Sequence, residues 1–216
     1  MATAGDLCTT IIGDLARGDA SLSDIVLLDI QSSIKEYEGQ RFYFNEQKIS
    51  LTLSATDTYA LSLFAAAATG ADDIIEIDFL NVAVNSTRTI QLDERTSKDL
   101  DLISGGSTSI NGYPQFYAVF NQSLRIFPMA ASTGYVSNMY AHVRLTQIAA
   151  GGFSTSNGWT NEGSDLIRNA ALKRLWGRRF KDYEAAQAAA AGEAAALKNL
   201  QRRMSALANQ QIAAYL

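Results

Sequence analysis

The sequence predicts an α+β fold in which terminal helices form a helical bundle, an antiparallel β sandwich or barrel is inserted between them, and a long C-terminal helix follows. The prediction depends on hydrophobic spacing. Apolar residues recur at helical spacing near both ends of the chain and alternate at strand spacing in the middle. We therefore expect a helical domain of residues 1–40 and 165–216, with a C-terminal helical tail, and a β domain of residues 41–164.

Composition and charge narrow the class of protein. With 47% hydrophobic and 19% charged residues, the 216-residue chain lies in the ordinary globular range. No apolar run approaches the roughly 18 residues of a membrane span. The N-terminus has no basic region like that of a signal peptide, and the lone Cys8 excludes an internal disulfide. These features indicate a cytosolic protein, or one assembled in a cytosol, without a membrane partner.

Two helices are expected before residue 40. The first covers residues 2–17 and stops at Gly18. The second runs from Leu22 to about Glu38, with Ser21 as its N-cap. Its apolar residues form one stripe, made of Leu27, Ile30, Ile34 and Tyr37. The two segments are typical of an αα-hairpin.

Strand periodicity begins at Arg41 and continues through "RFYFNEQKISLTLSATDTYALSL". The next stretch, "DIIEIDFLNVAVN", changes phase between Phe79 and Val82, which indicates a bulge or bend. "RTIQLDE" is expected to return as a strand, and "SKDLDLIS" to form one or two helical turns. A hairpin turning at Asn121 and Gln122 is predicted in "QFYAVFNQSLRIFP", before the closing strand "GYVSNMYAHVRLTQIA".

A Gly/Ser/Asn-rich loop around Trp159 precedes the C-terminal helical segment. From Asp165 the apolar residues keep a heptad-like frame, and alanine fills the middle. One unbroken helix to the end would be about 75 Å long, too long for a body of this size. We therefore expect a break near Gly177 or Gly192, or a projecting tail.

No set of residues suggests catalysis. His142 has no second histidine as a partner, and it and Cys8 are expected to be structural. The acidic pairs Asp72/Asp73 and Asp99/Asp101 lie at loop or strand edges, where solvated carboxylates are common. Neither a nucleophile elbow nor a phosphate-binding loop motif occurs. The sequence predicts no enzyme, no catalytic or metal-binding residues and no cofactor.

Aromatic residues allow two interpretations. Phe42, Tyr43 and Phe44 are candidates for a base- or sugar-stacking platform, or for core packing with Tyr43 left to solvent. Core packing is favoured, because few basic residues lie near them in the sequence. Phe42 and Phe44, together with Trp176, are then a structural junction. Two alternative functions stay open: a nucleic-acid-binding module that uses an aromatic sheet, and a carbohydrate-binding tail protein.

Charge is distributed unevenly along the chain. Residues 1–167 hold 9 basic and 19 acidic residues, a balance of −10, whereas residues 168–216 hold 9 basic and 3 acidic residues, a balance of +6. An acidic body argues against tight wrapping of nucleic acid. The basic tail is either a solvated helix face or a docking surface for a partner. The candidate docking residues are Arg178, Arg179, Lys181, Leu197, Leu200, Arg202, Arg203, Met204 and Leu207.

Three stretches also carry a family resemblance. They are "IKEYEGQRFYFNEQ" followed by "ISLTLSATDTYALS", the hairpin "GYPQFYAVFNQSLRIFPMA", and "NEGSDLIRNAALKRLW" leading into the last helix. In order and spacing they resemble the head-to-tail adaptors of tailed bacteriophages, which are connector, gatekeeper or tubular ring proteins of short-tailed phages. The resemblance spans most of residues 20–216.

The resemblance implies a structural virion protein assembled in the host cytoplasm. Such adaptors form a homo-oligomeric ring, commonly of twelve subunits, beneath the portal. Their helical part docks on the portal, here through the candidate docking residues, and their β part faces the tail nozzle or the next tail ring protein. Double-stranded DNA passes through the lumen without sequence-specific binding, and an acidic lumen wall would let it slide.

Overall fold

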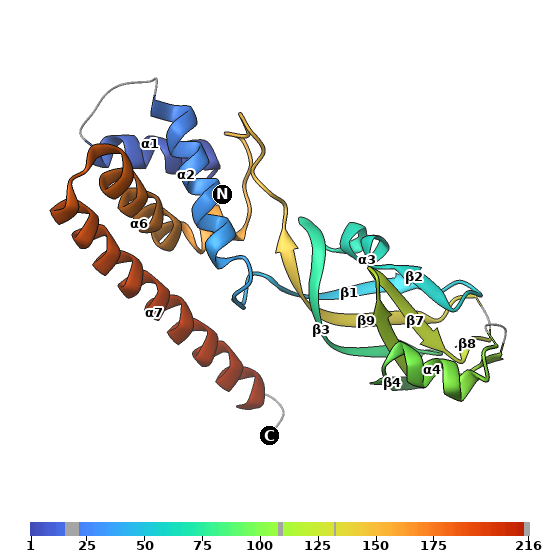
Figure 1. Cartoon of the computed structure of the whole chain (residues 1–216). Coiled ribbons are helices and arrows are strands. Elements are labelled where there is room, and N and C mark those ends of the chain that lie inside the picture. The colour runs from blue at the N-terminus through green and yellow to red at the C-terminus, as the bar shows by residue number, and fades with distance from the viewer. Residues whose placement is uncertain (16–21, 108–109, 132, 214–216) are drawn as a thin grey trace. The chain divides into compact units, whose positions relative to one another are not determined.

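The computed structural model describes residues 1–15, 22–107, 110–131 and 133–213, with side chains described as far as Leu207 (Figure 1). Its mixed helices and strands confirm the α+β fold class. The chain divides into two compact units. A helical unit comprises Met1–Asn45 with Leu145–Leu216, and a β unit comprises Glu46–Arg144. Residues 41–45 and the loop that begins at residue 145 were expected in the β domain. Their contacts instead place them in the helical unit.

The first two helices match their predicted positions. Helix α1 (Ala4–Asp14) begins with a capping box, in which the Thr3 side chain accepts from the Asp6 amide and the Asp6 carboxylate accepts from the Thr3 amide. Helix α2 (Ser23–Tyr37) has Leu22 as its N-cap. The predicted cap, Ser21, lies outside the described residues.

The C-terminal helical segment is broken, as its length required. Helices α5 (Gly158–Asn161) and α6 (Ser164–Arg174) continue into a π-helix, η2 (Leu175–Phe180). Lys181 then takes a left-handed conformation and ends this run. The last helix, α7 (Tyr183–Ala213), has 31 residues and is about 46 Å long. The break therefore lies near Gly177, and α7 continues through Gly192.

A seven-stranded sheet curls through the β unit in the order β1-β9-β3-β4-β6-β7-β2 (Figure 1). Its strands are β1 (Glu46–Thr52), β2 (Thr58–Ala60), β3 (Ala71–Ala83), β4 (Thr89–Glu94), β6 (Phe116–Phe120), β7 (Ser123–Phe127) and β9 (Val136–Leu145). Two short strands, β5 (Asn111–Gly112) and β8 (Met129–Ala130), pair separately. Helices α3 (Leu61–Ala67) and α4 (Ser97–Ser104) complete the described part of the unit.

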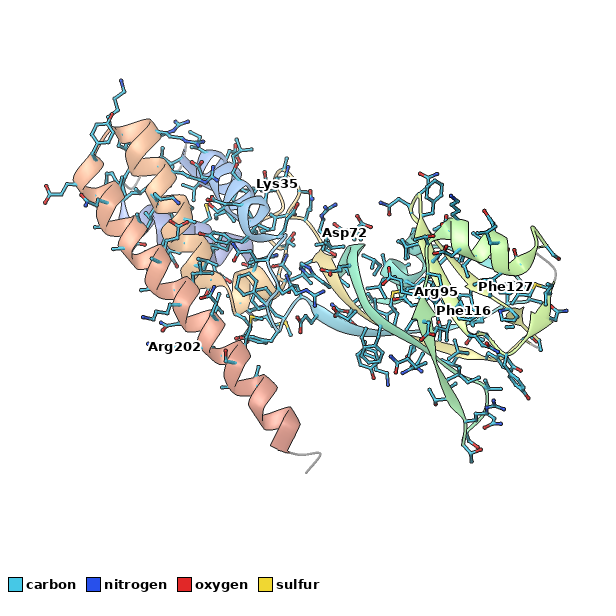
Figure 2. The ribbon with its side chains drawn as sticks, turned by 60° about the horizontal axis from the view of Figure 1, so that its bottom comes forward. Lys35, Asp72, Arg95, Phe116, Phe127 and Arg202 are labelled. Atoms are coloured by element: carbon cyan, nitrogen blue, oxygen red, sulfur yellow. The ribbon has the colours of Figure 1, made fainter. Side chains whose placement is uncertain are left out.

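Two strand pairs differ from the expected antiparallel arrangement: β4 with β6, and the short β5 with β8. Strands β4 and β6 run parallel, with Glu94 beside Tyr117. The segment between them includes α4, and such a crossover returns the chain in its original direction. Helix α4 packs over β6 and β7, where Leu100, Ala118 and Phe127 form a buried cluster with Phe116 against it. Figure 2 labels Phe116 and Phe127 at this position.

Two segments with strand periodicity are not strands. Residues 41–45 form a turn, because the Asn45 side chain accepts from the Phe42 amide at 2.7 Å and donates to the Gln40 carbonyl at 3.0 Å. Strand β1 consequently begins at Glu46. Farther on, the strand ends at Ala60 and α3 begins at Leu61, in a sequence whose alanines favour helix.

Three further strand predictions can be compared with the structure. Strand β3 is a single strand with apolar residues on both faces: Leu80 and Val82 are buried, whereas Ile75 and Phe79 are each 37% exposed. The predicted hairpin is confirmed. Strands β6 and β7 are joined by Asn121 and Gln122, whose φ angles of 49° and 59° are those of a type I′ turn. The closing strand β9 is also confirmed and pairs with β1.

Candidate functional site

Helix α7 is attached to the helical unit through Glu193, which is only 6% exposed. The Glu193 carboxylate accepts from the Tyr37 hydroxyl of α2 at 2.6 Å and pairs with the Lys173 ammonium of α6 at 2.6 Å. Burial, followed by the hydrogen bond to Glu193, raises the pKa of Tyr37 well above its usual value. A buried carboxylate is stable only with such partners, so this contact fixes the position of α7 on α2 and α6.

Gly192 lets α7 approach α6 closely. A Cβ at this position would lie 2.5 Å from Oδ1 of Asn169, whose amide nitrogen donates to the Asp165 carbonyl at 2.8 Å. Gly192 thus leaves room for the Asn169 side chain rather than breaking the helix. This part of α7 is packed and does not project.

The apolar stripe of α7 changes from covered to open along its length. Leu200 is 4% exposed, Met204 is half-buried and Leu207 is 41% exposed. Arg203 lies 3.6 Å from the Glu162 carboxylate, and Leu197, earlier on the helix, is half-buried. The stripe therefore begins on the chain's own core and ends at the surface.

The candidate docking residues fall into two groups. Arg178 and Arg179 are exposed in η2, and Lys181 is exposed immediately after it. The other group lies on the C-terminal part of α7, where Arg202 is exposed (Figure 2). From Tyr183 to Leu197, the first residue of the second group, α7 rises by about 21 Å. The two groups are therefore separate surfaces.

The structure brings two of the three junction residues together. The rings of Phe42 and Phe44 stack with centroids 5.3 Å apart, and Trp159 packs edge-on against them at 5.4 and 5.0 Å. Trp176 instead lies in η2 and contacts Phe180 at 5.3 Å. Phe42 is completely buried, so its ring is not available to stack on a base or sugar, whereas Tyr43 and Phe44 are half-buried. Tyr43 donates to the Glu162 carboxylate.

Sequence reasoning missed Glu193, Gly192 and Trp159. Glu193 is the only charged residue in positions 185–197, and an isolated charge within an alanine run was the available signal. Gly192 was one of two positions considered for a helix break, and Trp159 was placed in a loop. Both assignments depended on neighbours that are distant in sequence.

The other titratable residues that were weighed as catalytic or metal-binding candidates are buried or bonded to neighbouring residues. Cys8 is buried beside the Ser23 carbonyl, and burial raises its thiol pKa. His142 is buried in β9. Asp73 pairs with Arg144, Asp101 with Arg125, and Asp99 accepts from Thr96 at the start of α4.

Neither metal binding nor membrane insertion is suggested by the described part of the chain. No three His, Cys, Asp or Glu residues among the described ones are placed to hold a metal ion. Within the same residues, no helix combines the length and hydropathy needed to cross a bilayer.

A family model, described as SU10 adaptor protein, matches residues 2–214. The chain belongs to the SU10 adaptor protein family. The chain is therefore a structural adaptor protein of a bacteriophage and a virion component, and its family implies contacts with portal and tail components. No curated protein matches the chain.

Proposed function

We propose that this chain joins the phage head to the tail by docking on the portal protein through the C-terminal part of α7. The observation that carries the proposal is the course of the apolar stripe on α7. It is covered by the helical unit at Leu200 but open at Leu207, and Arg202 on the same part of α7 is exposed. An amphipathic helix with exposed apolar residues leaves apolar surface in water, and a groove on a partner protein would cover that surface.

The proposed assembly is a closed homo-oligomeric ring, commonly of twelve subunits in adaptors of this kind. A ring requires each subunit to present two different, complementary surfaces to its neighbours. In this arrangement the β unit faces the tail nozzle or the next tail ring protein, and double-stranded DNA passes through the lumen. Family membership over residues 2–214 supports this assignment.

A capture experiment with purified portal protein tests the docking proposal. We expect the double variant Arg202→Glu/Leu207→Asp to lose portal capture by roughly tenfold or more, since it places charge in an apolar contact. The control Lys98→Glu/Leu102→Asp makes the same charge change at exposed positions of α4 and is expected to retain capture. Equal capture of both variants would refute docking through this end of α7. Negative-stain images of wild-type protein with portal test the ring directly.

A further inference from the structure

Three exposed cations lie at the bend between α6 and α7. We call Arg178, Arg179 and Lys181 the basic knuckle. Within the part of the chain that the structure describes, their side chains form no ion pair or hydrogen bond. The carboxylate that interacts electrostatically with the two arginines is Asp29, which is half-buried on α2. Asp182 and Glu184 follow on the same turn and are also exposed, so the three cations face solvent with a net charge of +1 over residues 178–184.

Local backbone structure holds the knuckle in place. The η2 π-helix presents the two arginines, and Lys181 has a φ of 54°, an uncommon conformation for a residue with a side chain. The Asp182 amide donates to the Trp176 carbonyl at 3.0 Å, and the Asp182 carboxylate accepts from the Ala185 amide at 3.0 Å. These bonds close the bend and begin α7, so the three cations are presented on an ordered turn.

The surroundings of the knuckle favour phosphate over protein as its ligand. Apart from Phe180, every residue from 178 to 184 is exposed, so no wall or apolar pocket surrounds the three cations. Grooves on the helical unit lie elsewhere, one beside Ile34 and Ile148 and another beside Leu166 and Leu200. Tight protein interfaces depend on anchors buried in pockets, whereas phosphate contacts require only exposed Lys and Arg side chains.

We propose that the basic knuckle contacts the phosphate backbone of double-stranded DNA without reading its sequence. The inference rests on the proposed function, because the knuckle would encounter DNA in the channel of the proposed ring. Elsewhere the chain offers no net attraction. Outside the knuckle, the helical unit holds 9 basic and 12 acidic residues, and the β unit holds 6 basic and 10 acidic residues. Binding of DNA by the knuckle of one subunit is therefore expected to be weak. In a ring, the knuckles of all subunits would bind the same duplex and the overall affinity would rise.

Binding of the full-length protein to a short fluorescent DNA duplex of arbitrary sequence, measured by anisotropy over a salt series, tests the proposal. If all three cations contact phosphates, a fourfold increase in salt weakens wild-type binding by roughly 40-fold. The variant Arg178→Gln/Arg179→Gln/Lys181→Gly should lower the slope of log K against log salt by about 2.7. Glycine at position 181 removes the charge and suits the left-handed backbone.

A charge-matched control separates a local contact from net charge. Lys35→Gln/Lys98→Gln/Lys198→Gln also removes three exposed cations and should bind the duplex like wild type. Equal losses in both triple variants, or no duplex binding by wild type at low salt, would overturn the proposal. Binding to polyglutamate but not to duplex, lost in the knuckle variant, would overturn it in favour of an acidic protein partner.

Portal capture of the same variants distinguishes the two proposals. A knuckle variant that loses DNA binding but is still captured by portal supports separate surfaces. A knuckle variant that binds DNA normally but is no longer captured would overturn the inference and assign the knuckle to portal docking. If wild type binds duplex through the knuckle and is not captured by portal, the proposed function fails while the DNA contact stands.

Discussion

Glu193 connects three helices through a single carboxylate, with Tyr37 from α2 and Lys173 from α6 as its partners. At the residue scale, buried polar groups of this kind fix one arrangement, because any shift leaves a charge without a partner. Phe42, Phe44 and Trp159 have the equivalent role at the start of the β insertion, through ring packing. The stretch "RFYFNE" is therefore a packed turn, held by Asn45, rather than a binding surface.

Tyr117 is expected to make the free energy of unfolding fall as the pH rises above 10. It is 2% exposed in β6, and burial, followed by the charge of Glu94, raises its pKa from 10.0 to about 12. The folded state thus favours the neutral hydroxyl. The contribution of Tyr117 to the unfolding free energy is fully present below pH 10. It is lost as the pH rises from the pKa of the unfolded state through the pKa of the folded state, by about 2–3 kcal/mol in total.

Urea denaturation at pH 8 and at pH 11 tests the effect of Tyr117. We expect the Tyr117→Phe variant to lose less unfolding free energy between these two pH values than wild type. Tyr183→Phe, which alters an exposed ring on α7, should follow wild type. A Tyr117→Phe variant whose pH dependence equals that of wild type would contradict the prediction.

At the element scale, the helices and the hairpin follow from local sequence, but their contacts do not. Helices α1 and α2 and the turn at Asn121 were predictable, because spacing and turn residues act over a few positions, whereas the break could only be narrowed to Gly177, Gly192 or a projecting tail. The parallel pairing of β4 and β6 was not, because it depends on where the chain returns after α4. The start of α3 was missed for a related reason: "YALSLF" suits either a strand or a helix.

Substitution of Gly192 tests the close contact between α7 and α6. Alanine in a helix is ordinarily about 1 kcal/mol more favourable than glycine. Here its Cβ would meet the Asn169 side chain, so we expect Gly192→Ala to lower the unfolding free energy by about 1 kcal/mol instead. In an Asn169→Ala background the same substitution should become stabilising. Denaturant titration of the four proteins measures this double-mutant cycle, and additive effects would argue against the contact.

At the scale of the whole molecule, the chain enters and leaves the β unit along neighbouring strands. Glu46, at the start of β1, is the antiparallel partner of His142 near the end of β9. Such partners have Cα atoms about 5 Å apart, so the inserted segment starts and ends within a short distance. This geometry is typical of an inserted domain, and the two-domain organisation stays a prediction.

Excision of the insert tests that organisation. We expect a chain in which a linker of about four Gly/Ser residues replaces residues 46–144 to keep its helices and to unfold cooperatively. Circular dichroism during heating measures both properties. The control keeps the same linker but carries Glu193→Ala, and it should melt at a lower temperature. Loss of cooperative unfolding in the excised chain itself would show that the helical unit depends on the β unit.

The sequence alone determined the fold class, the main helices and the hairpin turn, because hydrophobic period and turn residues are local properties. It also supported the family resemblance, through the order of these features. Only the tertiary structure decided that α7 is packed at Glu193 and open at Leu207, and that Trp159 rather than Trp176 joins Phe42 and Phe44. Burial depends on which distant residues meet, and hydrophobic spacing in one segment carries no information about the segment that will cover it.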